Sequence, residues 1–360
     1  MDSPLYGIKL FFADGTFDPE FYAISDRIWF FRDERSYYIV RIAFLFDLIT
    51  FSSYSATACL FAVLSFVGGW MLYLTFYKKS PENYHLLALA VLFVPSVIFW
   101  GSGLMKDTVT LAFIGIATYE IDRLVTQRKL GLIHILLLII SLYSIFVIRK
   151  FLLQAYLPAV VLWIAALKYR SIESSMLRTL FLPFVMIIIV VLSYWSVVKI
   201  GEGDKRYALE QLGETSRITA YDIRYWTGKD AGSGYSLGEL DGTLTGMIRL
   251  APQAINVTLF RPYPWEIRNV LMIFSSVESA AMFFVTIYCL FKYWPRIRKN
   301  WKSPEVLFCL TFALVFAFGV GISTFNFGSL ARYKIPLLPF YLTAFVLLCT
   351  PPKEQEQWTE

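Results

Sequence analysis

The sequence predicts an all-α polytopic membrane protein with about nine transmembrane helices. Of its 360 residues, 57% are apolar and 17% are charged, and the mean hydropathy is +0.56. Soluble domains have about 45–50% apolar and about 25% charged residues. Aromatic residues make up 18% of the chain, and Trp and Tyr are enriched at membrane–water interfaces. This composition excludes soluble enzymes, nucleic-acid-binding modules and disulfide-stapled secreted domains.

Spans of sufficient length follow one another along most of the chain. A bilayer core of about 30 Å needs roughly 20 mainly apolar residues per helix. We predict spans at 55–77, 85–104, 107–122, 131–148, 151–167, 179–198, 270–291, 305–324 and 335–350. The clearest is 179–198, which has no charged residue, whereas 107–122 and 335–350 are short. Segments 36–51 and 243–260 have the pattern of helices that lie in the membrane interface.

The basic residues predict the orientation, because short cytoplasmic loops carry an excess of Lys and Arg. Thirteen basic residues lie in the loops after the first, third, fifth and seventh spans: Lys78, Lys79, Arg123, Arg128, Lys129, Lys168, Arg170, Arg178, Lys292, Arg296, Arg298, Lys299 and Lys302. We therefore predict that the N-terminus lies outside and the C-terminus in the cytoplasm.

This topology divides the chain into five predicted parts. They are an acidic and aromatic extracytoplasmic segment with an interfacial helix (1–54), a six-span bundle (55–198), an extracytoplasmic loop with amphipathic helices (199–269), a three-span bundle (270–350) and a cytoplasmic tail (351–360). Because the first part has no signal-like pattern, an additional helix upstream of Met1 is an alternative.

Cations accumulate at the outer ends of the predicted spans, where the orientation rule does not require them. The seven are Lys106, Arg149, Lys150, Arg261, Arg268, Arg332 and Lys334. A single such residue often only extends to the lipid headgroups, and Lys106 with Asp107 would also suit a structural ion pair or a helix cap. Ionisable groups at the membrane are nevertheless functional candidates by default, and we expect these seven to converge on one outer face. Other polar and aromatic residues accompany them as a predicted substrate loop: Tyr263, Trp265, Glu266, Glu278 and Asn326.

Fixed outer cations favour an anionic ligand anchored in the lipid, such as a polyprenyl phosphate that carries sugars. Arg offers phosphate a two-pronged fork, and Lys offers a point charge. Glycosyl transfer from this donor requires cations that stabilise the departing phosphate and a carboxylate that takes the proton of the acceptor hydroxyl. Asp14, Asp18 and Asp107 are the candidates for that carboxylate.

The metal requirement stays open at this stage. The chain has two His residues and no CxxC pair, so a His- or Cys-built metal site is not expected. Asp14 and Asp18 are able to bind Mg²⁺ or Mn²⁺, although carboxylates four residues apart in a loop are common.

Three phrases carry a family resemblance: PSVIFWGSGLMKD, LFRPYPWEIRN and NFGSLARYKIPLLPF. They resemble poorly characterised bacterial multi-span membrane proteins of surface-polysaccharide gene clusters. The resemblance implies a relative of GT-C glycosyltransferases or of Wzy-type and EpsG-type polymerases in the bacterial inner membrane. A GT-C enzyme would use an acidic residue of the first outer loop, for which Asp14 or Asp18 is the nearest match although both precede every predicted span. A Wzy-like enzyme would use outer arginines, here Arg149, Arg261 and Arg332.

Three function classes remain after the sequence is read. The first is an extracytoplasmic glycosyltransferase or polymerase, whose partners are a polyprenyl-linked sugar, a glycan acceptor and membrane lipids. The second is a flippase or transporter of a lipid-linked glycan, and the third is a non-catalytic subunit that associates with other envelope-biosynthesis proteins. No nucleic-acid partner is expected, since the basic residues lie in short loops between spans.

Overall fold

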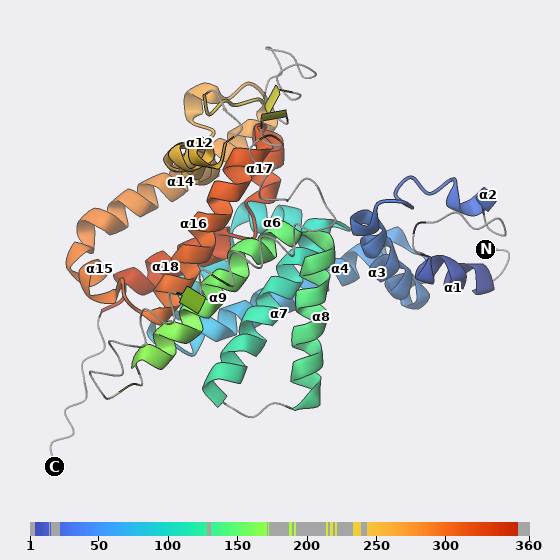
Figure 1. The fold of residues 1–360 in the computed structure, drawn as a ribbon, viewed down its shortest axis with the longest axis horizontal. Coiled ribbons are helices and arrows are strands. Elements are labelled where there is room, and N and C mark those ends of the chain that lie inside the picture. Colours follow the sequence, from blue (N-terminus) through green and yellow to red (C-terminus); the bar gives the residue numbers. More distant parts are fainter. Residues whose placement is uncertain are drawn as a thin grey trace. The chain divides into compact units, whose positions relative to one another are not determined.

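The computed structural model of the chain is built of helices (Figure 1). It describes residues 4–13, 15, 22–127, 131–170, 172, 233–238 and 243–351, with single positions or pairs at 187–188, 191, 214, 217–218 and 220–221. Within these residues there is no β-strand, and one isolated bridge joins Gly234 to Asn326. The predicted all-α class is therefore confirmed.

Four helices are long and apolar enough to cross a membrane on their own. They are α4 (Tyr54–Tyr77), α9 (Lys150–Arg170), α14 (Val270–Lys292) and α16 (Pro304–Thr324). Two bent pairs also qualify if each pair is one span: α5 (Tyr84–Leu92), preceded by the 3-10 helix η1 (Pro81–Asn83), with α6 (Pro95–Gly101), and α17 (Phe327–Tyr333) with α18 (Leu338–Cys349). The described residues thus contain four to six candidate spans and fit an integral membrane protein.

Two further helices occupy predicted spans but do not qualify as membrane-crossing by length and composition. Helix α7 (Lys106–Gln127) covers 107–122 and carries several charged residues, and α8 (Leu132–Ile148) covers 131–148 with 17 residues. The predicted span 179–198 lies largely outside the described residues. A total of nine spans stays a prediction.

Two of the predicted spans are bent rather than straight. The helix axis turns by 50° between α5 and α6, directly before Pro95, because proline disfavours helical backbone at the preceding residue. It turns by 63° between α17 and α18, across residues 334–337, and Pro339 lies in the first turn of α18. The predicted span 85–104 is therefore interrupted, and the second bend lies at the start of the predicted span 335–350, whose remainder is α18.

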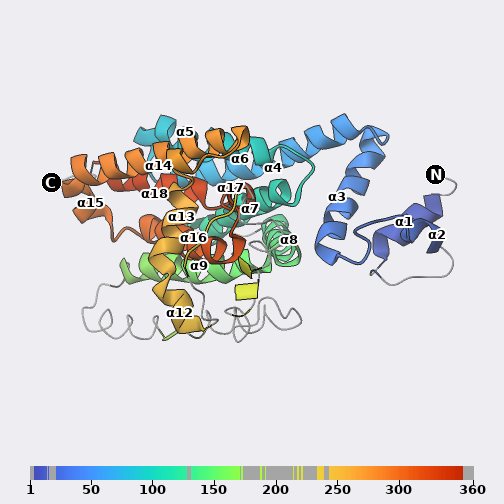
Figure 2. The ribbon, with the colours of Figure 1, turned by 90° about the horizontal axis from the view of Figure 1, so that it is seen from above.

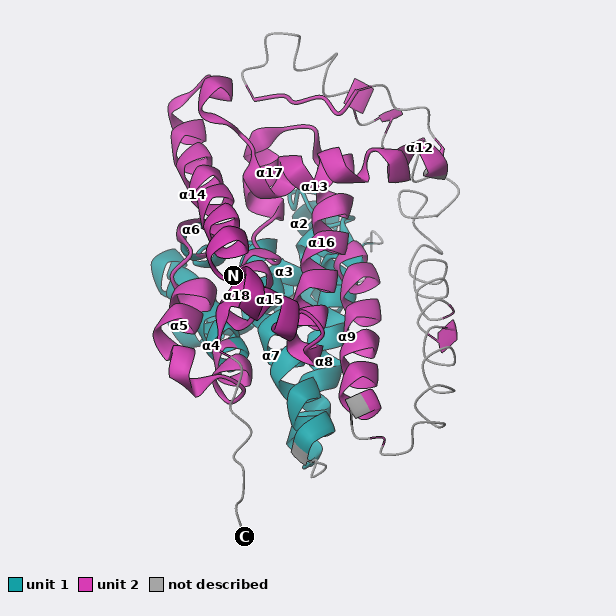
Figure 3. Ribbon diagram, turned by 90° about the vertical axis from the view of Figure 1, so that its left-hand side faces the viewer, with its two compact units in different colours: residues 1–72, 98–150 teal, residues 73–97, 151–360 magenta. Residues whose placement is uncertain are grey.

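The chain divides into two compact units (Figure 3). Unit 1 comprises residues 1–72 and 98–150, and unit 2 comprises residues 73–97 and 151–360. This division follows contacts within the chain, whereas the predicted five-part division follows the sides of a membrane, so the latter stays a prediction.

Unit 1 contains α1 (Pro4–Phe12), α2 (Tyr22–Ser25), α3 (Glu34–Thr50), most of α4, and α7 and α8. Helix α3 confirms the helix expected at 36–51. The two charged residues within it, Arg41 and Asp47, both have hydrogen-bond partners. Arg41 donates to the carbonyl oxygen of Ala13 over 2.6 Å, and Asp47 accepts from Thr57. Both charges therefore have partners inside this unit.

Helices α4 and α7 approach each other closely at two glycines. A Cβ added to Gly115 would lie 2.0 Å from the carbonyl oxygen of Gly68, and a Cβ added to Gly68 would lie 2.2 Å from that of Ala112. Small residues at helix interfaces let the backbones approach in this way. The packing of α4 on α7 therefore depends on the absence of side chains at both positions.

Gly115→Ala is expected to lower the free energy of unfolding by about 1–3 kcal/mol, the typical cost of overpacking. The backbone of α4 has to move, because the atom in the way is a carbonyl oxygen. The heat-unfolding midpoint in detergent measures the loss. Gly319→Ala is the control, since a Cβ at this position of α16 has no neighbour within 4 Å. Equal midpoints for the two variants would contradict the close approach.

Unit 2 has an aromatic core in which α16 lies between α9 and α18 (Figure 2). From α16, Phe308 stacks on Trp163 of α9 with ring centroids 4.6 Å apart, and Phe312 meets Phe340 of α18 at 4.7 Å. All four side chains are buried. Their packing anchors the helices that lead to the loops of the candidate site.

The helix expected at 243–260 is two helices, α12 (Leu244–Arg249) and α13 (Ala251–Phe260). The break lies at Leu250, because Pro252 suits the first turn of a new helix and cannot continue the previous one. Helix α13 packs tightly on α16: Thr258 donates to the carbonyl oxygen of Ala317 over 2.8 Å. The expectation of one amphipathic interfacial helix is corrected to a short helix followed by one with a buried face.

Candidate functional site

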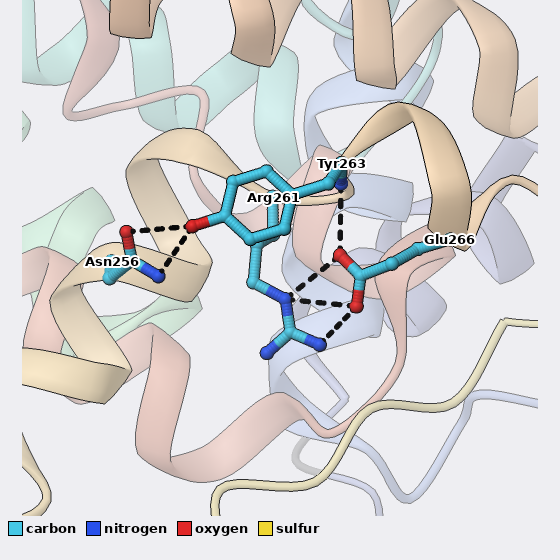
Figure 4. A network of polar contacts seen from close by, with 4 residues as sticks. All are labelled: Asn256, Arg261, Tyr263 and Glu266. Atoms are coloured by element: carbon cyan, nitrogen blue, oxygen red, sulfur yellow. Dashed lines mark hydrogen bonds and ion pairs between the residues drawn. The ribbon is translucent and has the colours of Figure 1, made fainter.

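Arg261 ends α13 and holds the carboxylate of Glu266 in the following loop (Figure 4). The Nε of Arg261 lies 2.9 and 3.1 Å from the two carboxylate oxygens, and a terminal guanidinium nitrogen also donates to Glu266. The 3-10 helix η2 (Pro264–Glu266) turns the chain back, so that the backbone N–H of Tyr263 donates to the same carboxylate over 2.9 Å. Both charged side chains are 19% exposed.

The Arg261 guanidinium keeps Glu266 ionised. Burial alone would raise the pKa of the Glu266 carboxyl, but the bonds and charge of Arg261, the Tyr263 N–H and the charge of Arg268 outweigh it and lower that pKa below its ordinary value. The pair is therefore a charge-assisted contact at neutral pH, and its guanidinium is held in one place.

Aromatic rings surround the guanidinium of Arg261. Its central carbon lies 5.4 Å from the ring centroid of Phe327, 5.8 Å from Tyr235 and 6.0 Å from Tyr263, distances at which a cation is attracted to a ring face. The Tyr235 hydroxyl donates to the carbonyl oxygen of Gly321 over 2.9 Å, and its burial raises the pKa of that phenol well above its ordinary value. Tyr235 is therefore a neutral wall of the site.

One side of this aromatic group is open to the surroundings. Tyr263 exchanges hydrogen bonds with Asn256 over 3.0 and 3.2 Å and stacks on Trp265 with ring centroids 4.8 Å apart. Trp265 itself is 79% exposed. The site therefore places a fixed guanidinium next to an accessible aromatic face.

Three loop segments of unit 2 meet at this point. Asn326 caps α17 by accepting from the backbone of Gly328 and Ser329, and its amide donates to Ser233 over 3.1 Å. The backbone N–H of Tyr235 donates to the carbonyl oxygen of Phe325 over 3.0 Å. Segments 233–235 and 325–327 are thereby joined beside Arg261, and four residues of the predicted substrate loop lie in this part of unit 2: Tyr263, Trp265, Glu266 and Asn326.

Two other predicted residues of unit 2 are engaged in contacts away from this loop, Lys334 buried and Glu278 half-buried. Lys334 is 1% exposed and donates to Ser279 over 3.0 Å. Glu278 accepts from the backbone N–H of Ser96 over 2.9 Å. Arg268 is exposed and Arg332 is half-buried. Of the four predicted substrate-binding cations in this unit, Lys334 is thus closed off from a ligand at the surface.

The predicted residues of unit 1 are engaged in local contacts. Asp107, which is fully buried, forms an ion pair with Arg149, which is 7% exposed. Lys106 pairs with Asp33 over 3.3 Å, and the ammonium of Lys150 lies 5.0 Å from the ring centroid of Phe146. Lys106 and Asp107 therefore form ion pairs with different partners.

The remaining predictions are not tested by the described residues. Asp14 and Asp18 lie outside them. The seven cations fall into two units, three in unit 1 and four in unit 2, so their convergence on one face stays a prediction. Among the described residues, no group of three or more His, Cys, Asp or Glu residues is arranged to hold a metal ion.

Sequence reasoning missed several members of these sites. Tyr235 and Phe327 carry no charge and follow no motif, although Phe327 is adjacent to the predicted Asn326. Ser279, which bonds Lys334, is a small polar residue next to Glu278 and is common in membrane helices. In unit 1, His134 lies 3.0 Å from Glu120, which is 1% exposed. The sequence signal for this contact is a single His within an apolar run, which indicates that its ring has a polar partner.

No family model, curated protein or solved structure matches this chain. The arrangement around Arg261 therefore has to be interpreted from its own chemistry. A guanidinium recognises phosphate and carboxylate groups, and an exposed aromatic face accommodates the apolar side of a flat ring. Together they suit a ligand that is anionic at one end and has a ring with apolar faces at the other.

Proposed function

We propose that this chain is an integral membrane glycosyltransferase or polysaccharide polymerase that acts at the extracytoplasmic face on polyprenyl-phosphate-linked sugars in cell-surface glycan synthesis. The observation that supports it is the guanidinium of Arg261, held by Glu266 and surrounded by rings, beside the exposed face of Trp265. A sugar phosphate offers the two features that this site complements.

In this proposal Arg261 binds and stabilises the departing phosphate, and Arg268 adds a second cation from the same loop. Trp265 and Tyr263 receive the sugar ring. Asp107 is not suited to act as the base, because its complete burial and its ion pair with Arg149 remove that carboxylate from an incoming hydroxyl. Loss of a single preorganised group that stabilises charge costs about 10²- to 10³-fold in rate.

The proposal includes a membrane arrangement finer than four to six spans. We place nine spans in the bacterial inner membrane, with the N-terminus outside and the C-terminus in the cytoplasm, as the thirteen basic residues of alternate loops favour. The outer phrases resemble bacterial multi-span proteins of surface-polysaccharide gene clusters, and the relationship to GT-C, Wzy-type or EpsG-type enzymes that this resemblance implies agrees with this orientation.

A lipid-linked glycan flippase is the second candidate, and one observation favours it. Both bent helix pairs, α5–α6 and α17–α18, contribute polar groups around Glu278. Transporters place substrate and ion sites at interrupted helices of this kind. The two candidates differ in what accumulates when the protein is absent.

The deciding experiment is the profile of lipid-linked oligosaccharides in cells that lack the protein. The strain is complemented with wild type, with Arg261→Ala, or with Arg249→Ala, an exposed arginine of α12 that serves as the control. A transferase predicts that a defined precursor accumulates, that wild type and Arg249→Ala restore the product, and that Arg261→Ala inserts normally but does not.

The side on which the precursor accumulates separates the candidates further. A transferase leaves its unextended precursor exposed at the outer face, whereas a flippase leaves a completed glycan at the inner face. An unchanged profile in the deletion strain would reject both candidates and favour a non-catalytic subunit, whereas full rescue by Arg261→Ala would reject the transferase.

A further inference from the structure

Lys334 is a buried cation at an interrupted helix. It follows α17 at the 63° bend that precedes α18, and its side chain is 1% exposed. Lysine is almost never fully buried unless its ammonium group is paired. The ammonium group donates to the hydroxyl of Ser279 in α14 over 3.0 Å, so the question is what this contact accomplishes.

Ser279 passes the contact on to the candidate site. Its hydroxyl, which is fully buried, donates to the backbone carbonyl oxygen of Arg261 over 3.0 Å. The direction is fixed: an ammonium group only donates, so the hydroxyl accepts from Lys334 and its own hydrogen goes to the carbonyl. A hydroxyl polarised by a cation donates a stronger hydrogen bond.

Glu278 completes this arrangement from the neighbouring position of α14. Glu278 lies within electrostatic range of Lys334, and one of its oxygens accepts from the backbone N–H of Ser96, in the first turn of α6. The pair of Lys334 and Ser279 is therefore connected through Glu278 to the start of α6, which belongs to the other bent helix pair.

We propose that Lys334 and Ser279 are positioning residues that fix the backbone of Arg261 and thereby keep its guanidinium aligned with Glu266 and the surrounding rings. Lys334 acts from inside the unit and does not touch the ligand, whereas Arg261 does. Arg261 is the C-cap of α13, so its carbonyl oxygen has no hydrogen-bond donor within the helix. The hydrogen bond from Ser279 therefore fixes the position of this carbonyl group. The consequence for catalysis rests on the proposed function, whereas the consequence for Arg261 does not.

The first test measures Arg261 directly and needs no substrate. Membranes that contain the full chain are treated with phenylglyoxal, which modifies guanidinium groups, and the modification of Arg261 is followed by mass spectrometry with the exposed Arg268 as internal reference. We expect Ser279→Ala to increase the Arg261 rate about fivefold, the factor that corresponds to one lost hydrogen bond. Lys334→Met is expected to act in the same direction.

Two variants control for general loosening of the fold. Ser276→Ala removes a hydroxyl that is 1% exposed and lies one turn earlier in α14, so it should leave the Arg261 rate unchanged. Ser279→Thr retains a hydroxyl and should keep the low rate. If Ser279→Ala and Ser276→Ala give the same rate, or if Ser279→Thr behaves like Ser279→Ala, the positioning role is overturned, whether or not Lys334→Met folds.

The second test uses transfer from a polyprenyl-diphosphate-linked sugar in the same membranes. If transfer occurs, Ser279→Ala should lower kcat more than it raises KM, because a displaced guanidinium loses contact with charge that develops during the reaction. If no transfer occurs while Ser279→Ala still exposes Arg261, the proposed function fails and the positioning role stands. If transfer is wild-type in Ser279→Ala and the Arg261 rate does not change, the positioning role fails alone.

Discussion

Replacing Arg149 with Met, or Asp107 with Leu, is expected to lower the free energy of unfolding by about 3–5 kcal/mol, because either change leaves an opposite charge buried without its ion-pair partner. Asp107 is fully buried and Arg149 is 7% exposed. Asp107 lies in the first turn of α7 and Arg149 caps the C-terminus of α8, positions at which the helix dipoles favour an anion and a cation respectively. The pair therefore joins the start of one helix to the end of the next.

The double variant is the sharper measurement. Asp107→Leu with Arg149→Met removes both charges, and we expect it to recover most of the loss, since a buried ion pair replaced by apolar residues is often neutral in stability. Lys106→Met is the matched control: it breaks the partly exposed contact with Asp33 and should cost less than about 1 kcal/mol. The heat-unfolding midpoints of the two single variants, the double variant and Lys106→Met are each compared with that of wild type in detergent. A double variant no more stable than the single ones would show that the pair is not the dominant contact.

This expectation changes how variants of Asp107 are interpreted in cells. A failure of Asp107→Ala to restore glycan synthesis has an explanation in folding alone. This explanation weighs less for Arg261, because Arg261 and Glu266 are each 19% exposed whereas Asp107 is fully buried. Arg261 therefore tests the enzymatic proposal better than Asp107 does, provided that the amount of inserted protein is measured for each variant.

Helix positions were readable from the sequence because they depend on local patterns. The apolar runs at 55–77, 270–291 and 305–324 end within two residues of α4, α14 and α16. The bends were harder to predict from the sequence. Pro95 visibly interrupts an apolar run, but the angle between α17 and α18 depends on packing inside unit 2. The division of 243–260 at Leu250 follows from Pro252, a signal that was present and outweighed by the amphipathic pattern.

Partners of the charged residues were not readable, because they are set by contacts between distant segments. Arg149 is 42 residues from Asp107 and Lys106 is 73 residues from Asp33. The sequence alone supports several pairings of similar plausibility, including Lys106 with its neighbour Asp107. The Arg261–Glu266 contact joins residues only five positions apart, so a local pattern is sufficient to place these two side chains near each other.

Glu266→Ala is expected to lower the free energy of unfolding by about 3 kcal/mol, because the carboxylate accepts two kinds of bond that the variant loses. One is the charge-assisted contact with Arg261, and the other is the hydrogen bond from the backbone of Tyr263; hydrogen bonds to charged groups contribute about 1.5–3 kcal/mol each. Glu266→Gln retains an acceptor but no charge and should lose less. The free energy of unfolding of Glu266→Gln, compared with those of wild type and Glu266→Ala, measures how much of the loss depends on the charge of Glu266.

The pH dependence of the stability difference between wild type and Glu266→Gln tests whether the charge of Glu266 causes it. The pKa of Glu266 in the folded chain lies below its ordinary value, so its charge stabilises the fold above the pKa of the unfolded chain, and that stabilisation is lost as the pH falls through the folded pKa. The stability difference between wild type and Glu266→Gln should therefore be constant from neutral pH to the ordinary range of Glu and shrink under more acidic conditions. Glu82→Gln, in the loop after α4, provides the reference for a carboxylate outside this site. A wild-type advantage that persists unchanged into strong acid would mean that the charge of Glu266 does not hold Arg261, and the guanidinium would then owe its place to the aromatic rings.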